Sequence, residues 1–179
     1  MAFKLQRVFR LTKAYPSIFI PLFTVLSIGI NATAQIPTKN YNQNSLKEAS
    51  VKQFGPIIRA KQDEGKITIS SLNKAQQAYY LENSRFASNF GQLGVGISAE
   101  TGNYSYKVAV VNPRSARSTA SGKDTRIRSY TGAVFVIGSG NNATTIAGIC
   151  ESNRASRTPP LMPRLVRNNI QCPAGSTKL

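Results

Sequence analysis

The sequence contains no histidine, and only seven of its 179 residues are acidic. Histidine is the usual base of hydrolytic triads and a frequent zinc ligand, so its absence excludes the serine-hydrolase and zincin patterns. The only adjacent carboxylates, Asp63 and Glu64, would diverge by about 100° on a helix and would not face one substrate. We interpret them as part of a solvated helix face near Lys61 and Lys66. We expect no catalytic residue, metal site, cofactor or small-molecule substrate.

Cysteine is equally scarce, with only Cys150 and Cys172 in the chain. One intramolecular pairing is possible, and the alternative is two separate thiols. If the two cysteines pair, closing the loop between them stabilises the fold by about 3 kcal/mol on a chain-entropy estimate. No thiol is then left for nucleophilic chemistry.

The N-terminus has the order of a secretory signal peptide, in which a basic head precedes an apolar run and a small-residue cleavage site. Four basic residues open the chain, and residues 14–34 carry no charge. Ala32 and Ala34 form an A-x-A pattern, which predicts cleavage after Ala34 and Gln35 as the first mature residue. Alternatively, residues 14–34 are long enough to anchor the chain in the inner membrane. We expect export to the periplasm, cell surface or exterior, where disulfides persist.

Without residues 1–34 the chain keeps 19 basic residues against seven acids, a net charge of +12. A strongly basic surface attracts polyanions, here extracellular DNA or acidic polysaccharide at the cell surface. One functional hypothesis is therefore a secreted module that binds polyanions; the alternative is that the basic residues only keep the domain soluble. The candidate contact residues are Arg114, Arg117, Lys123, Arg126, Arg128, Arg154, Arg157, Arg164 and Arg167.

The first half of the chain predicts an arm followed by one long helix. Residues 35–55 are polar and asparagine-rich, which is typical of a linker. Proline is tolerated in a first helical turn, so we expect a helix over residues 56–83 at the start of a folded domain, 56–179. Gly65 is a weak point at which the helix could kink. The predicted buried stripe is Ile58, Gly65, Ile69, Leu72, Ala75 and Tyr79, and the predicted solvated stripe is Asp63, Lys66, Ser70, Asn73 and Gln77.

The second half changes to the period of two that is typical of strands. We expect strands over 103–111, 129–138 and 143–150, with GSGNN as a tight connection between the last two. Residues 112–128 are interpreted as an exposed basic loop, and the tail from Glu151 as irregular. The tyrosines at 79, 80, 104 and 106 could stack on bases or sugars, but their spacing favours packing in the core. The fold class is α+β.

Five segments in this order resemble the type IV pilin-like G and H family. They are AKQDEGKITISSLNKAQQAYYLENSRFASNFGQLGVGI (60–97), NYSY, YTGAVFV, TIAGICE and the terminal QCPAGST. The resemblance implies a pilin-like headpiece, with a long N-terminal helix on an antiparallel sheet of three or four strands. It also implies that Cys150 and Cys172 close a C-terminal loop. The implied role is a non-enzymatic structural or accessory component of type IV pili or a type II secretion-like system, with subunits of those systems as partners.

The chain departs from the family pattern at its N-terminus. Typical members have a short basic leader, a processing site and an apolar half-helix that runs directly into the domain. Here the apolar run ends in A-x-A at Ala34, and about 20 polar residues precede Pro56. We therefore expect cleavage to release a headpiece that lacks the usual segment for assembly into a filament core.

Overall fold

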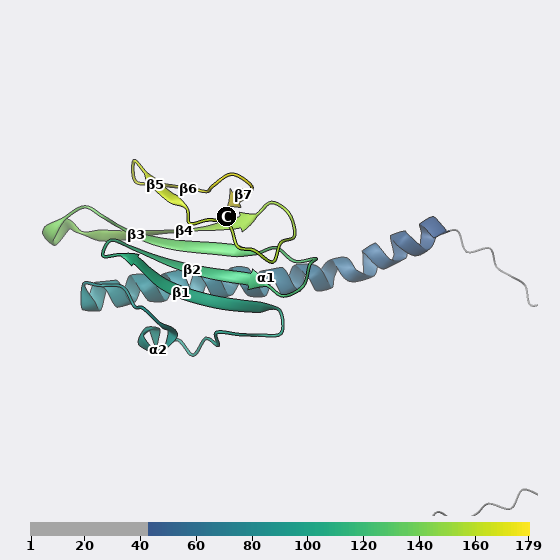
Figure 1. Cartoon of the computed structure of the whole chain (residues 1–179), viewed down its shortest axis with the longest axis horizontal. Helices are drawn as coiled ribbons and strands as arrows, with labels where there is room; N and C mark the ends of the chain where they lie inside the picture. Colours follow the sequence, from purple (N-terminus) through teal and green to yellow (C-terminus); the bar gives the residue numbers. More distant parts are fainter. Residues whose placement is uncertain (1–42) are drawn as a thin grey trace, which may run out of the picture. The chain divides into compact units, whose positions relative to one another are not determined.

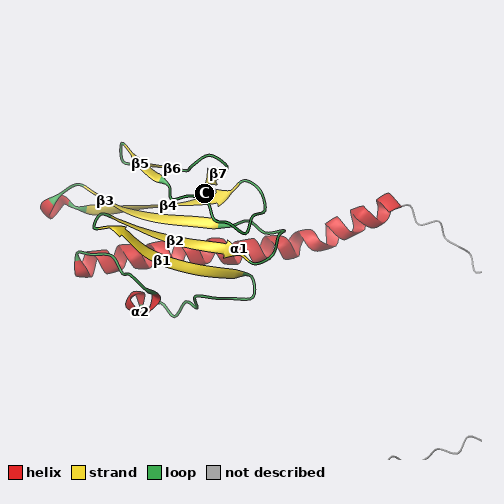
Figure 2. Ribbon diagram, viewed as in Figure 1, coloured by secondary structure: helices red, strands yellow, loops and turns green. Residues whose placement is uncertain are grey.

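A long helix crossing one face of an antiparallel sheet forms the body of the protein (Figures 1 and 2). The computed structural model describes residues 43–179; the predicted signal peptide, its cleavage residues Ala32, Ala34 and Gln35, and the alternative anchor lie outside them. The elements are α1 (Gln43–Asn83), α2 (Phe90–Leu93), β1 (Tyr104–Asn112), β2 (Ser115–Gly122), β3 (Tyr130–Ile137), a 3-10 turn η1 (Gly140–Asn142), β4 (Thr144–Ser152), β5 (Arg164–Val166), β6 (Asn169–Gln171) and β7 (Ser176–Lys178).

The helix α1 begins at Gln43, so the predicted start at Pro56 is wrong. Residues 43–55 are polar overall, but LKEASVKQF is largely built from good helix formers, which is why the helix can begin upstream of the predicted start. Pro56 lies inside α1, where it has no amide hydrogen for the carbonyl of Lys52. The helix also continues through Gly65. No helix among residues 43–179 is both long and apolar enough to cross a membrane.

The sheet is a meander of order β1-β2-β3-β4-β7, with every neighbouring pair antiparallel. It therefore has one strand more than the upper limit of four that we predicted. The expected basic loop at 112–128 is wrong, because residues 115–122 form β2 between β1 and β3. SARSTASG has few of the residues that favour strands, so the sequence did not predict a strand here. Its alternate residues Ala116, Ser118 and Ala120 are buried, and their small size lets α1 lie close above them.

The C-terminal tail is more regular than predicted. It contains the β5–β6 hairpin, whose two turn residues Arg167 and Asn168 have positive φ, and it returns to the sheet as β7. Cys150 and Cys172 form a disulfide, as expected from the family resemblance. Beside it, Ile170 is buried against Gly148, where an added Cβ would lie 2.9 Å from the isoleucine side chain. The tail therefore covers the face of β4 that α1 does not contact.

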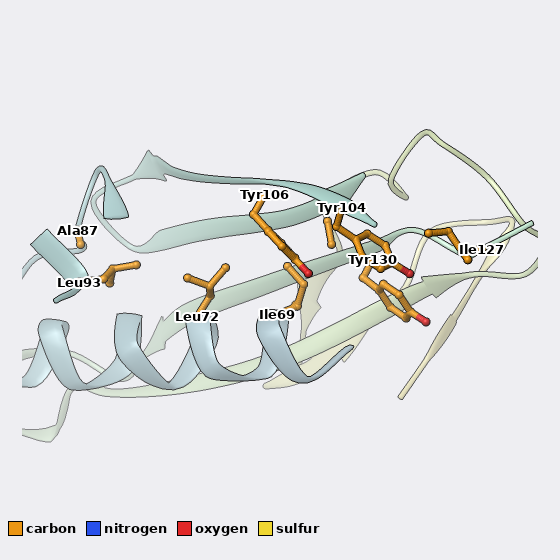
Figure 3. Close-up of a cluster of buried hydrophobic side chains, with 9 residues drawn as sticks. Ile69, Leu72, Ala87, Leu93, Tyr104, Tyr106, Ile127 and Tyr130 are labelled. Carbon is orange, nitrogen blue, oxygen red and sulfur yellow. The ribbon is translucent and has the colours of Figure 1, made fainter. Parts of the chain in front are cut away.

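The largest core cluster lies between α1 and the first three strands (Figure 3). Ile69 and Leu72 point from the helix towards Tyr104, Tyr106 and Tyr130 of the sheet, and all five side chains are at least 97% buried. The Tyr104 ring is 5.8 Å from that of Tyr106 and 6.1 Å from that of Tyr130, centre to centre. The expected packing role of Tyr104 and Tyr106 is thus confirmed.

The predicted solvated stripe of α1 is wrong at Asn73, which is 4% exposed. Its Nδ2 donates a hydrogen bond to the carbonyl of Gly148 at 3.1 Å, and its amide lies against Gly132. The neighbouring Gln76 is fully buried and exchanges two hydrogen bonds with the backbone of Ala87, at 2.8 and 3.0 Å. Polar residues therefore extend the buried face of α1 because each finds a backbone partner.

Gly65→Ala tests the close approach of α1 to the sheet. A Cβ at residue 65 would lie 2.7 Å from Cζ of Tyr104. We expect a loss of about 1–3 kcal/mol in the free energy of unfolding, although alanine normally improves a helix. In a Tyr104→Leu background the same substitution should be neutral or stabilising. Chemical denaturation of the four proteins measures the coupling, and an equal cost in both backgrounds would contradict this explanation.

Replacing both cysteines by alanine tests what holds the tail. The bridge joins residues separated by 22 positions, so its loss should lower the free energy of unfolding by about 3 kcal/mol. Amide hydrogen exchange should rise in residues 153–172 and stay slow in β1, β2 and β3. If exchange in the tail did not change, the contacts of Ile170 alone would be sufficient to hold it.

Candidate functional site

Glu64 joins α1 to the turn that precedes β1. Its Oε1 accepts hydrogen bonds from Thr101 Oγ1 at 2.5 Å and from the Tyr106 hydroxyl at 3.2 Å, and its Oε2 accepts one from Asn103 Nδ2 at 2.6 Å. The expectation that Glu64 lies on a solvated face is therefore wrong. Asp63 does lie on that face, exposed and paired with Lys66 at 3.1 Å. The sequence carried no local signal for the Glu64 contacts, because Thr101 is 37 residues away.

The hydrogen bonds to Glu64 decide its ionisation. Burial by itself raises the pKa of a carboxyl group, but the donors on Thr101, Asn103 and Tyr106 outweigh it and hold the pKa of Glu64 below its ordinary value. Burial in turn raises the pKa of Tyr106 to about 12, so its hydroxyl stays protonated and donates. A carboxylate held in this way is a structural acceptor, and its low pKa does not suit a general acid near neutral pH.

A second carboxylate, Glu151, organises the end of β4. Its Oε2 accepts from Arg128 Nη1 at 2.5 Å and its Oε1 accepts from the Tyr130 hydroxyl at 2.9 Å. Burial is the main cause that raises the pKa of Tyr130 above its ordinary range. Among residues 43–179, no three side chains of the types that bind metals gather into a possible site.

Four of the nine predicted polyanion contacts are engaged within the fold. Lys123 pairs with Glu100 at 2.5 Å, Arg126 with Asp124 at 2.8 Å and Arg128 with Glu151. The fourth, Arg114, donates from Nη2 to the carbonyls of Val136 and Gly138 at 3.0 and 2.8 Å. The hydrogen bonds from Arg126 hold the pKa of Asp124 well below its usual range.

The side chains of the other five predicted contacts are exposed and make no hydrogen bond or ion pair within the described part of the chain: Arg117, Arg154, Arg157, Arg164 and Arg167. Arg117 lies on β2, and the other four lie in the segment that the disulfide closes. Two hollows of about 350 and 560 Å³ border this segment. Arg164 lines the first and Arg154 the second, and Ala174 lines both. We name residues 150–179 the C-terminal surface.

The geometry is that of a pilin-like headpiece: an α+β domain with a long helix across an antiparallel sheet and a disulfide-closed C-terminal segment. The sequence model of the type IV pilin-like G and H family matches residues 62–173, more than half of the chain, and the protein belongs to this family. A search among curated proteins and a search among solved structures each returned no match.

Glu64→Gln tests the hydrogen bonds that link α1 to β1 and the turn before it. The amide keeps the shape but loses the charge that three donors stabilise, so we expect about 1–2 kcal/mol less stability at neutral pH. Because the pKa of Glu64 is lower in the folded state, its contribution is complete above the ordinary value of 4.5 and declines as the pH falls through the folded-state pKa. Urea denaturation at several pH values measures the difference between the two proteins. A difference that stayed constant from neutral pH to pH 2 would contradict the ionic role.

Proposed function

We propose that the protein is an exported, non-enzymatic pilin-like protein that serves as a structural or accessory component of a type IV pilus or a type II secretion-like system. Membership of the pilin-like family supports this function. The basic and apolar order of residues 1–34 supports export. The disulfide fits an oxidising compartment.

The observation that carries the proposal is the part of α1 that extends past the sheet (Figure 1). Phe54 and Ile57 lie three residues apart on one side of α1, just before Ile58 packs against the core, and each is about half exposed. Large apolar side chains that project from a helix are typical anchors for a groove on a partner. A neighbouring pilin-like subunit is the partner that we propose for this part of α1.

Site-specific photo-crosslinking tests this contact in the native host. A crosslinking residue at position 54 or 57 should form adducts with pilin-like subunits, identified by mass spectrometry in sheared filaments or envelope fractions. Arg59 is the matched control, because it is exposed, follows Ile57 by two residues and lies on the opposite side of α1. Intact mass of the recovered protein tests the predicted mature terminus at Gln35 in the same sample.

The proposal would be overturned by equal crosslinking at residues 54, 57 and 59, or by recovery of the protein entirely outside filament and envelope fractions. A mass that retains residues 1–34 would instead favour the anchored form.

A further inference from the structure

The C-terminal surface is basic because its arginines are not neutralised. The only acidic side chain in residues 150–179 is Glu151, and that carboxylate is occupied by Arg128 and Tyr130. Arg154, Arg157, Arg164 and Arg167 therefore remain as four exposed cations without a partner among residues 43–179. Arginine binds carboxylate and phosphate oxygens through two parallel N–H groups, which favours an anionic ligand here.

The two hollows place other unused polar groups beside two of these arginines. In the hollow with Arg154, Asn153 uses only its Oδ1, which accepts from Thr177 at 2.7 Å, and the Thr158 hydroxyl makes no hydrogen bond with a described residue. In the hollow with Arg164, the side chain of Gln171 likewise makes none. Each hollow thus combines one cation with amide or hydroxyl groups suited to sugar hydroxyls.

The composition of this surface argues against recognition of nucleic-acid bases. Residues 150–179 contain no phenylalanine, tyrosine or tryptophan, and the sheet tyrosines Tyr104, Tyr106 and Tyr130 are buried. Single-stranded nucleic acids are usually held by aromatic side chains that stack on bases. A sugar polymer that carries carboxylates at intervals matches the two adjacent hollows better than a nucleic acid does. Each hollow can receive one acidic sugar.

We infer that the C-terminal surface binds a linear acidic polysaccharide that carries carboxylates, with Arg154 and Arg164 as the principal contacts and Arg157 and Arg167 extending the path. The binding uses the disulfide-closed segment and not the projecting part of α1. It is therefore independent of the association with pilus subunits, and its test contains no such subunit.

The test is binding of the purified protein to oligomeric alginate, a polymer of uronic acids, measured by biolayer interferometry at low and physiological salt. Neutral dextran and a 20-base-pair DNA duplex are the comparison ligands. Arg154→Gln/Arg164→Gln should weaken alginate binding about tenfold, as expected for two exposed charges. The matched control is Arg59→Gln/Lys74→Gln, which removes from α1 two exposed cations without a partner among residues 43–179 and should have a much smaller effect.

Arg154 and Arg164 are exposed, so both double variants should keep the melting temperature of the parent. If the first variant folded poorly, Arg157→Gln/Arg167→Gln would replace it with the same expected direction. If the α1 variant weakened alginate binding equally, net charge alone would explain the effect, and the assignment would be overturned. Absence of alginate binding at low salt, or tighter binding of duplex DNA at matched charge, would also overturn it.

Discussion

The close approach of α1 to the sheet is the constraint on which the rest of the structure depends. At Gly65 the helix backbone meets the ring of Tyr104, and at Gly132 the sheet backbone meets Ile69 and Asn73, so a Cβ at either glycine would lie within 3 Å of its neighbours. Small residues of β2 continue the same contact along the helix. Interiors pack as densely as organic crystals, so this spacing fixes which side chains fit between the two layers.

The same packing explains how the few acids are used. Glu64 lies where α1 passes the turn before β1, and Glu151 lies where β4 meets the loop before β3. Each carboxylate compensates for its partial burial by accepting several hydrogen bonds, which is the condition for keeping a charge near a core. Because these acids act as internal acceptors, they are not available to neutralise the arginines of the C-terminal surface. The basic character of that surface follows from how the interior is built.

The projecting part of α1 and the C-terminal surface thus differ in chemistry. The N-terminal part of α1 carries exposed apolar side chains, as suits contact with another protein. The C-terminal surface carries arginines that have no partner in the described part of the chain and lie beside polar groups. The disulfide and the contact of Ile170 with Gly148 hold the second surface against the sheet. Our proposals assign one partner to each surface, and neither needs a catalytic group.

Sequence by itself determined the α+β class, the long helix through residue 83, the strands near 104, 130 and 144, and the family, because these depend on local periodicity and ordered motifs. It did not predict β2, and it predicted that Asn73 and Glu64 lie on solvent-exposed faces of the helix. Only the tertiary structure decided those positions, and only it separated the arginines with an internal partner from those without one among residues 43–179. The physical reason is that each outcome depends on partners far along the chain: Gly148 for Asn73, Thr101 for Glu64 and Glu151 for Arg128.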